Sequence, residues 1–483
     1  MNLKVISRNV GMALLVSSLF MLLAVMVSLF DGGDSALTPL LISFTITFSF
    51  GFFPFIFVRK TARITLKDGY MIIFLSWLLN FVFGALPYVL WGGPFSLVNA
   101  WFESVSGFTT TGATILESIE DLPRSLLFWR ASTHFIGGLG VVVFIVLIIP
   151  SSSPVKLRLV NMELSSLSRD DYRSRANRTV FIFAYVYLGI CAAAFLCYCL
   201  AGMPVFDAIC HAFSVCATGG FSSRDLSIGS FHSPLISIIT IVFMFLASVH
   251  FGLIFMTLAS RTLSPLKNPV LFFYVSCLVV ISGVVSFSLK ADGIDPTWGS
   301  AFLDGTFHVV SYASTTGFAI SDNAEWAMLP ASMLLIVSLI CGCAGSTTGG
   351  MKVDRVMVLL KAIYMQIKQT LSPSGIYEIR MGRRVLHGAD IYPHVLYMCM
   401  FILLIGFSSI VCLLVGDPNG HAFTGSVASL SNVGPSLGTI GSMGNYNAEP
   451  AVMKCIFTFD MFLGRVEIYP VFAVFASLFN RKY

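Results

Sequence analysis

Charged residues are scarce in this chain of 483 residues: Asp, Glu, Lys and Arg together make up only 11% of it. A soluble domain carries about 25%. Hydrophobic residues instead reach 56%, and the mean hydropathy is +0.85. The composition therefore excludes an ordinary soluble protein and indicates an integral membrane protein.

Several chemical motifs are absent as well. An intramembrane hydrolase using His134, His211, His250 or His308 is disfavoured because the sequence has no HExxH and no aspartate pair in neighbouring apolar segments. GSTTGG lacks the GxxxxGK[ST] order of a P-loop ATPase. None of the 11 cysteines forms a CxxC pair, so we interpret them as reduced packing residues. No cleavable signal peptide is evident, so the first apolar run is expected to be a retained span. We expect no enzyme activity.

Ten apolar segments are long enough to cross about 30 Å of hydrocarbon. They lie near residues 11–30, 37–58, 69–91, 126–150, 179–203, 234–258, 269–289, 329–364, 392–416 and 450–479. The eighth is interrupted by CGCAGSTTGGMK, and the fourth and tenth carry charges. The predicted fold is an all-α integral membrane protein with ten transmembrane helices.

The basic residues predict the orientation of these helices. If both termini are cytoplasmic, most of the 29 Lys and Arg residues fall on the inner side, and the outer side holds mainly acids such as Asp31, Glu117 and Asp292. The net charge of +5 is then an inside-facing signal and predicts no nucleic-acid partner. We expect a multi-pass protein of the cell membrane, with lipid as its surroundings.

A segment of one design recurs four times on the expected outer side. The first is FTTTGAT, in which Thr109, Thr110 and Thr111 precede Gly112. The others are CATGGFSS around Gly220, ASTTGFAI around Gly317 and LSNVGPSL around Gly434. Thirteen residues before the glycines stand Asn99, Asp207, Asp304 and His421, which predict short helices with polar caps. One such loop alone would be an ordinary extracellular turn, but four in register indicate an internal repeat.

A short helix that ends inside a membrane points its last carbonyl groups, and the negative end of its dipole, at a cation. The residues after it tolerate membrane depth only where they line a water- or ion-filled path. Four such loops around one axis present rings of oxygens that replace the hydration shell of an ion. The predicted selectivity filter consists of Thr110, Thr111, Gly112, Thr218, Gly219, Gly220, Thr315, Thr316, Gly317, Asn432, Val433 and Gly434.

The interruption of the eighth segment is a candidate gate. Each glycine costs a helix about 1 kcal/mol relative to alanine, so four of them should unwind it. Such a loop could lie across the path under the third filter segment, with Lys352 and Arg355 linking it to the cytoplasmic side. A packing kink against a neighbouring helix is the alternative. The candidate gate residues are Gly342, Gly345, Ser346, Thr347, Thr348, Gly349, Gly350 and Lys352.

With these motifs the sequence resembles the Trk/Ktr/HKT superfamily of potassium transporters, and within it the membrane subunits of bacterial Trk systems. The resemblance spans essentially the whole chain. Besides the four loops it is carried by LFWRASTHFIGGLGVVV, GCAGSTTGGMKV and MFLGRVEIYPV. The fourth loop departs from the other three, because Asn432 and Pro435 flank Val433 and Gly434 where they have a run of hydroxyls. The contribution of side-chain hydroxyls is therefore in doubt there.

The resemblance implies four membrane–pore–membrane repeats in a pseudo-fourfold arrangement around one ion pore, after two N-terminal helices. The corresponding units are residues 1–66, 67–160, 161–263, 264–385 and 386–483. It also implies a homodimer in the bacterial inner membrane and TrkA-like cytoplasmic regulatory subunits. ATP, ADP or NAD(H) is expected on those subunits, whereas this chain should carry no cofactor and K⁺ is the transported ion.

The resemblance further suggests that Arg465 faces the pore below the filter as an electrostatic barrier; a buried ion pair with Glu103 or Asp460 is the alternative. For Arg130 and His134, which share a helix face, we favour a structural hydrogen-bonding role. The leading function is channel-like potassium uptake driven by membrane potential. Proton- or sodium-coupled symport, or sodium uptake, remains open, and proton coupling would need a titratable group such as His134, Glu103 or Asp460.

Overall fold

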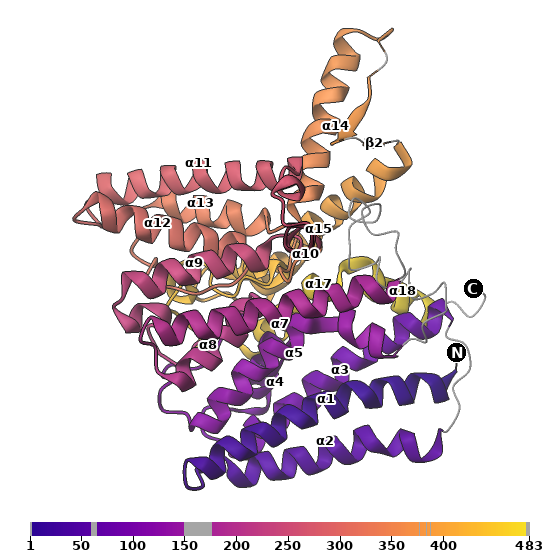
Figure 1. Cartoon of the computed structure of the whole chain (residues 1–483), viewed down its shortest axis with the longest axis vertical. Coiled ribbons are helices and arrows are strands. Elements are labelled where there is room, and N and C mark those ends of the chain that lie inside the picture. Colours follow the sequence, from indigo (N-terminus) through magenta and orange to yellow (C-terminus); the bar gives the residue numbers. More distant parts are fainter. Residues whose placement is uncertain are drawn as a thin grey trace.

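The computed structural model describes residues 2–58, 65–148, 176–375, 377–382, 384–386 and 388–479. The described chain is mostly α-helical (Figure 1), as predicted. The predicted boundary between the first two repeats, and many of the basic residues used for the orientation, lie outside these ranges.

Two long helices precede the repeats. They are α1 (Leu3–Phe30) and α2 (Leu37–Phe57), which pack closely against each other. Gly11 and Gly51 lie at their contact, where a side chain on Gly11 would meet the backbone of Gly51. Small residues allow this close approach between helices in a membrane. α1 also packs against α3 and α5 of the first repeat.

Each of the four repeats then consists of a long helix, a short helix and an interrupted helix. The first is α3 (Leu66–Trp91), α4 (Leu97–Phe108) and α5 (Arg124–Ile148); the second is α7 (Ala176–Leu200), α8 (Val205–Ala217), α9 (Pro234–Ser248) and α10 (Phe251–Ser260). The third is α11 (Pro269–Ala291), α12 (Trp298–Ala313), α13 (Met328–Leu339) and α14 (Val353–Leu371); the fourth is α15 (Gly388–Val415), α16 (Ala422–Ser431), α17 (Ala451–Val466) and α18 (Ile468–Phe479). Short 3₁₀ turns occur at η3 (Ser227–Phe231), η4 (Ser264–Leu266) and η5 (Gly438–Ile440).

The caps of the short helices differ from the prediction. The side chains of Ser96 and Thr297 cap α4 and α12, and Pro204 precedes α8. Asn99, Asp207 and Asp304 lie inside the helices, so the cap assignment was wrong for them. His421 does stand at the cap position of α16, but its side chain makes no capping bond.

The predicted interruption of the eighth segment is present between α13 and α14. Three further segments, in which no interruption was predicted, are interrupted too. α5 has non-helical backbone at Gly140, α9 and α10 meet at an angle of 99°, and Glu467 separates α17 from α18 with a φ of 68°. At the second of these breaks, the ring of His250 caps α10 by accepting from the amide of Gly252 at 3.0 Å. At the α9–α10 break, the freed backbone groups are bonded by the loop before α14, which a hydrophobicity pattern does not reveal.

By length and composition, six described helices could each cross a membrane, and the bent pair α9–α10 gives a seventh. The six are Leu3–Phe30, Leu37–Phe57, Lys67–Trp91, Phe181–Leu200, Pro269–Ala291 and Asp390–Val415. The other three of the ten predicted spans correspond to α5, α13–α14 and α17–α18, each of which is interrupted.

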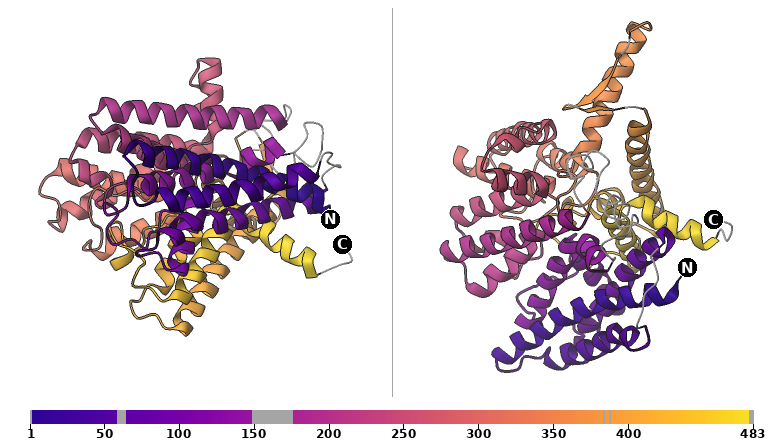
Figure 2. Two further views of the ribbon diagram at one scale, coloured as in Figure 1. Left: turned by 90° about the horizontal axis from the view of Figure 1, so that it is seen from below. Right: turned by 45° about the vertical axis from the view of Figure 1, so that its right-hand side comes forward.

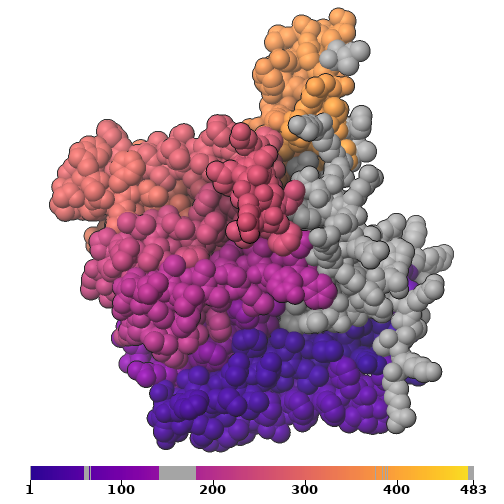
Figure 3. Space-filling model, viewed as in Figure 1, coloured from indigo at the N-terminus to yellow at the C-terminus, as the bar shows by residue number. Residues whose placement is uncertain are grey.

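The start of α1 and the end of α18 lie at the same end of the bundle (Figure 1, Figure 2). α14 projects beyond the other helices and leads into a small antiparallel hairpin of β1 (Ile379–Met381) and β2 (Arg384–Leu386). The space-filling view shows this projection standing clear of the main body (Figure 3). At its base, Met357 and Val358 of α14 pack against the hairpin in a small separate core.

Candidate functional site

The four glycine loops have the same backbone conformation. Each short helix is followed by a residue in the left-handed region, and the glycine two residues later also has a positive φ. The values are 52° and 83° for Thr110 and Gly112, 54° and 85° for Thr218 and Gly220, 54° and 80° for Thr315 and Gly317, and 55° and 86° for Asn432 and Gly434. The repeat seen in the sequence is therefore a repeat of backbone geometry.

One hydrogen bond closes each helix end in the same way. The residue between the left-handed residue and the glycine donates its amide to the carbonyl five residues earlier. This bond satisfies a carbonyl at the end of the helix that would otherwise be unpaired. The bonds are Thr111 to Ser106 at 2.9 Å, Gly219 to Ser214 at 2.9 Å, Thr316 to Ser311 at 2.9 Å, and Val433 to Ala428 at 3.0 Å.

Threonine at the left-handed position was not anticipated from the sequence. A β-branched residue rarely adopts a positive φ, and holding one there costs about 1 to 3 kcal/mol. Thr110, Thr218 and Thr315 all do so, whereas Asn432 accepts the conformation more easily. Strain at the same point of three loops points to a function for the hydroxyl-bearing side chain, since a glycine there would relieve it.

The four loops contact one another in a closed ring. At each glycine, a carbonyl oxygen of the next loop occupies the space that a side chain would need. This oxygen lies well under 3.0 Å from the position that a Cβ would take. Gly112 faces the carbonyl of Gly219, Gly220 that of Thr316, Gly317 that of Val433, and Gly434 that of Thr111. Any side chain at these glycines would collide with backbone.

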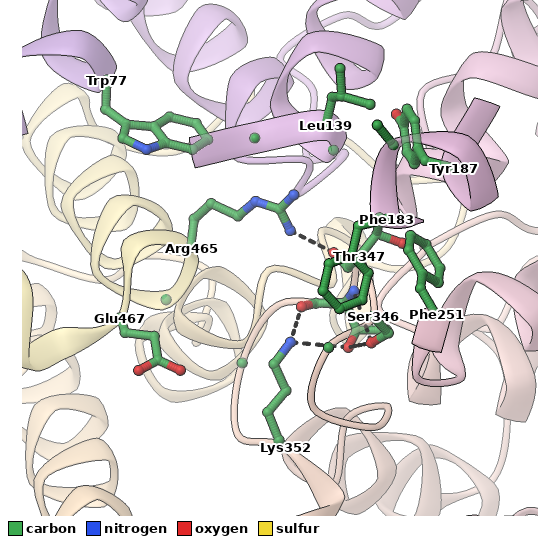
Figure 4. A pocket seen from close by; sticks show the side chains of 17 residues that line it. Trp77, Leu139, Phe183, Tyr187, Phe251, Ser346, Thr347, Lys352, Arg465 and Glu467 are labelled. Carbon is green, nitrogen blue, oxygen red and sulfur yellow. Dashed lines mark hydrogen bonds between the residues drawn. The ribbon is translucent and has the colours of Figure 1, made fainter. Parts of the chain in front are cut away.

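One cavity is lined by the ring, and a second is lined by the breaks of the interrupted helices. All four glycines line the first, of about 630 Å³, which also contains Arg224 and Asp225. The second, of about 810 Å³, is lined where the interrupted helices break: by Gly138 to Gly140 of α5, Phe251 of α10, the loop before α14, and Arg465 of α17 (Figure 4). The breaks therefore converge on one space beside the loops.

Charge at the first cavity is balanced locally. Arg224 donates to Asp207 of α8 at 2.8 Å and lies 3.6 Å from Glu120. The hydrogen bond to Asp207, and the charge of that carboxylate, raise the pKa of Arg224 above its ordinary value. No group of three or more His, Cys, Asp or Glu side chains in the described ranges could hold a metal ion.

The glycine-rich loop between α13 and α14 docks into the break between α9 and α10. Its Cys343 amide donates to the Ser248 carbonyl at 2.9 Å, and its Gly345 carbonyl accepts from the Phe251 amide at 3.0 Å. The loop also reaches the ring, because the Gly349 amide donates to Thr315 Oγ1 at 3.0 Å. The predicted gate and filter residues are thus brought into contact.

Arg465 holds the same loop from the opposite side. Its guanidinium donates to the Thr347 carbonyl at 2.6 Å (Figure 4) and to the Gly137 carbonyl of α5 at 2.8 Å. The acids considered as alternative partners are engaged elsewhere, since Glu103 pairs with Arg130 at 2.7 Å and Asp460 accepts from Ser408 at 2.7 Å. These contacts favour the loop over an ion pair with either acid.

Two cations follow the loop. The Lys352 ammonium donates to the carbonyl of Thr348 and to its hydroxyl at 3.1 Å. Arg355 pairs with Glu467 at 2.7 Å and lies 3.7 Å above the ring of Tyr397. The base of α14 is thereby tied to the break that follows Arg465.

Arg130 and His134 brace the loops, in agreement with the structural role favoured from the sequence. Arg130 donates to Glu103 at 2.8 Å and to the Ser222 carbonyl at 3.1 Å, and covers the ring of Phe221 at 4.0 Å. His134 Nδ1 lies 3.0 Å from Ser214 Oγ, and its ring stacks on Phe221. The first and second loops are joined through these contacts.

The TrkH family, described as cation transport proteins, matches residues 39–482 of the chain. The chain belongs to this family. It is 32% identical to the Trk system potassium uptake protein TrkH of Salmonella typhimurium over 494 residues, covering 100% of both. It is 33% identical to TrkG of Escherichia coli K12, covering 100% of this chain and 99% of that one. A crystal structure of the potassium transporter TrkH from Vibrio parahaemolyticus superposes with a TM-score of 0.89, at 30% identity and over 99% of this chain and 100% of the other. The family resemblance inferred from the motifs is confirmed.

Proposed function

We propose that the chain is a potassium uptake transporter, and not an enzyme, in which the four glycine loops form the selectivity filter. The closed ring of loops, whose glycines line a cavity, is the observation that carries the proposal. The relatives at about one-third identity are named as potassium uptake proteins, which supports K⁺ as the transported ion.

Selection would occur at the oxygens of the ring. Each short helix directs its C-terminal end, which is partially negative, at the loops. Carbonyl and threonine oxygens would then replace the hydration shell of K⁺, and their number and field strength would set the preference over Na⁺. The glycines are required because the next loop occupies the place of their side chains.

The loop between α13 and α14 would act as the gate. It is held in place by Ser248, Thr315 and Arg465, all through hydrogen bonds that can be broken without unfolding a helix. Arg465 would both fix the loop and repel a passing cation. α14 begins directly after this loop and projects beyond the other helices, where a partner would bind and move the loop.

The finer organisation is part of the same proposal. It comprises ten membrane-crossing segments, a pseudo-fourfold pore and both termini in the cytoplasm of a bacterial inner-membrane protein. It also includes a homodimer and TrkA-like nucleotide-binding subunits that act on α14. K⁺ is the cargo, and ATP, ADP or NAD(H) would bind the partner.

Proton-coupled symport is the second candidate, because two of the three groups considered for proton coupling from the sequence each have a buried atom without a hydrogen-bond partner in the described structure. These are Asp460 Oδ2 and His134 Nε2. Either group could exchange a proton if water reached it.

Flux into proteoliposomes separates the candidates. With an inside-negative potential and no pH gradient, channel-like uptake predicts K⁺ entry well above Na⁺ entry. Imposing a pH gradient at constant potential should leave that rate unchanged. A K⁺ flux that follows the pH gradient, and loses this dependence in Asp460→Asn, would support symport and contradict the channel-like proposal.

A further inference from the structure

The fourth loop lacks a support that two of the other loops have. Six residues before the filter glycine, the second and third repeats have Ser214 and Ser311, whereas the fourth has Ala428. Ser311 Oγ donates to the carbonyl of Phe318, the residue after the glycine, at 2.7 Å. Ser214 Oγ instead lies 3.0 Å from the ring of His134. Alanine can make neither contact.

A tyrosine from outside the repeat motif supports the fourth loop instead. The hydroxyl of Tyr446 donates to the carbonyl oxygen of Gly434 at 2.8 Å, and its backbone amide donates to the carbonyl of Thr114 at 2.8 Å. Within the described residues, Gly434 is the one filter glycine whose carbonyl accepts a side-chain hydrogen bond. Tyr446 therefore joins the fourth loop to the first.

The position of this tyrosine is itself well fixed. Its side chain is only 2% exposed, and its ring packs against Phe102 at 5.3 Å and Phe457 at 5.9 Å. A rigid ring of this kind holds the hydroxyl at a set distance, whereas a flexible side chain would lose more conformational entropy on making the same bond.

A second tyrosine supports the fourth loop at Ser436, two residues after Gly434. Tyr312, on the third short helix, donates its hydroxyl to the Ser436 carbonyl at 3.1 Å and accepts from Asn323 Nδ2 at 2.7 Å. Pro435, between the two bonded carbonyls, has no amide hydrogen with which to fix the segment itself. The two hydroxyls hold the segment on either side of this proline.

We propose that Tyr446, assisted by Tyr312, is a positioning residue that sets the K⁺ over Na⁺ preference by fixing the Gly434 carbonyl. The inference rests on the proposed filter. A carbonyl that accepts a hydrogen bond from a hydroxyl has a fixed direction and a weaker remaining field, and selectivity depends on the placement and field strength of the ring oxygens. Released from Tyr446, this segment could move toward a smaller ion.

The test compares three Tyr→Phe variants, each of which removes one hydroxyl and keeps the ring. Tyr446→Phe should lower the K⁺ to Na⁺ flux ratio in proteoliposomes roughly fivefold, equivalent to about 1 kcal/mol. Tyr312→Phe should shift it in the same direction by less, because its bond lies farther from Gly434. Tyr198→Phe is the control: its buried hydroxyl bonds Thr240 at 3.0 Å, between α7 and α9. Its ratio should match the wild type.

Gly112→Ser, measured alongside, distinguishes the two possible failures. If Gly112→Ser changes the ratio but neither Tyr446→Phe nor Tyr312→Phe does, the filter stands and the tyrosine inference is wrong. If Gly112→Ser folds and also leaves the ratio unchanged, both the proposed filter and the tyrosine inference are wrong. Lower melting temperatures for both tyrosine variants at an unchanged ratio would show a purely structural role and overturn the inference.

Discussion

Replacing Arg465 by alanine tests the gate most directly. The substitution removes the hydrogen bonds to the Thr347 and Gly137 carbonyls, and a bond from a charged donor contributes about 1.5–3 kcal/mol. It also removes a positive charge. At a distance of about 6 Å and an effective dielectric of about 20, that charge would repel K⁺ by about 3 kcal/mol.

Even half of the repulsion, left after screening by water in the cavity, exceeds the roughly 1.36 kcal/mol that corresponds to a tenfold change in rate. We therefore expect Arg465→Ala to raise K⁺ flux about tenfold. Arg465→Lys should raise it much less, because the charge remains although an ammonium lacks the fork that spans two carbonyls.

Tracer uptake and melting temperature should be measured on the same preparation. Lys267→Ala, which removes an exposed charge after η4, serves as the control and should behave like the wild type. Faster flux in a stable Arg465→Ala protein supports the gate. A less stable and slower protein would refute the reasoning and show that Arg465 mainly holds the fold together.

Three further predictions concern the filter glycine Gly112, the loop between α13 and α14, and the ion pair of Arg130 with Glu103. Gly112→Ser should lower the K⁺ to Na⁺ flux ratio, because its Cβ would collide with the Gly219 carbonyl; an unchanged ratio in folded protein removes Gly112 from the filter. Shortening the loop between Gly345 and Gly350 should raise basal flux at an unchanged ratio; loss of flux in assembled protein would favour the packing-kink alternative. Arg130→Gln should lower the melting temperature, because an unpaired buried Glu103 costs about 3–5 kcal/mol, and adding Glu103→Gln should restore part of it. Equal melting temperatures for the single and double variants would contradict that account.

The repeat was predictable because its signal is local. A glycine, a polar start to the helix and an apolar run recur in register, and the same local forces act at each copy. The interruption before α14 was predictable for a similar reason, since four glycines close together weaken any helix. The helix caps were not, because Asn99 and Asp207 are good caps in general but Ser96 and Pro204 stand at the actual boundaries.

The breaks at His250 and Glu467 were not found in this way. The break at His250 lies in an apolar run without a proline, whereas Pro470 follows Glu467 by three residues and is a local signal for the second break. Both breaks also have partners distant in the sequence. The backbone freed between α9 and α10 is bonded by Cys343 and Gly345, and Glu467 is paired with Arg355. The one local signal for the first break is a histidine followed closely by Gly252 within an apolar segment.

These long-range bonds join the proposed gate to the proposed filter. The Gly349 amide of the loop donates to the hydroxyl of Thr315, which is one of the strained left-handed residues that follow the short helices. Withdrawal of the loop must break this bond and free the hydroxyl. It must also release the Ser248 carbonyl and the Phe251 amide, which need water or another partner when the loop leaves. In the proposed open state, the Ser248 carbonyl and the Phe251 amide must therefore be satisfied by water in the cavity beside Arg465 or by another protein group.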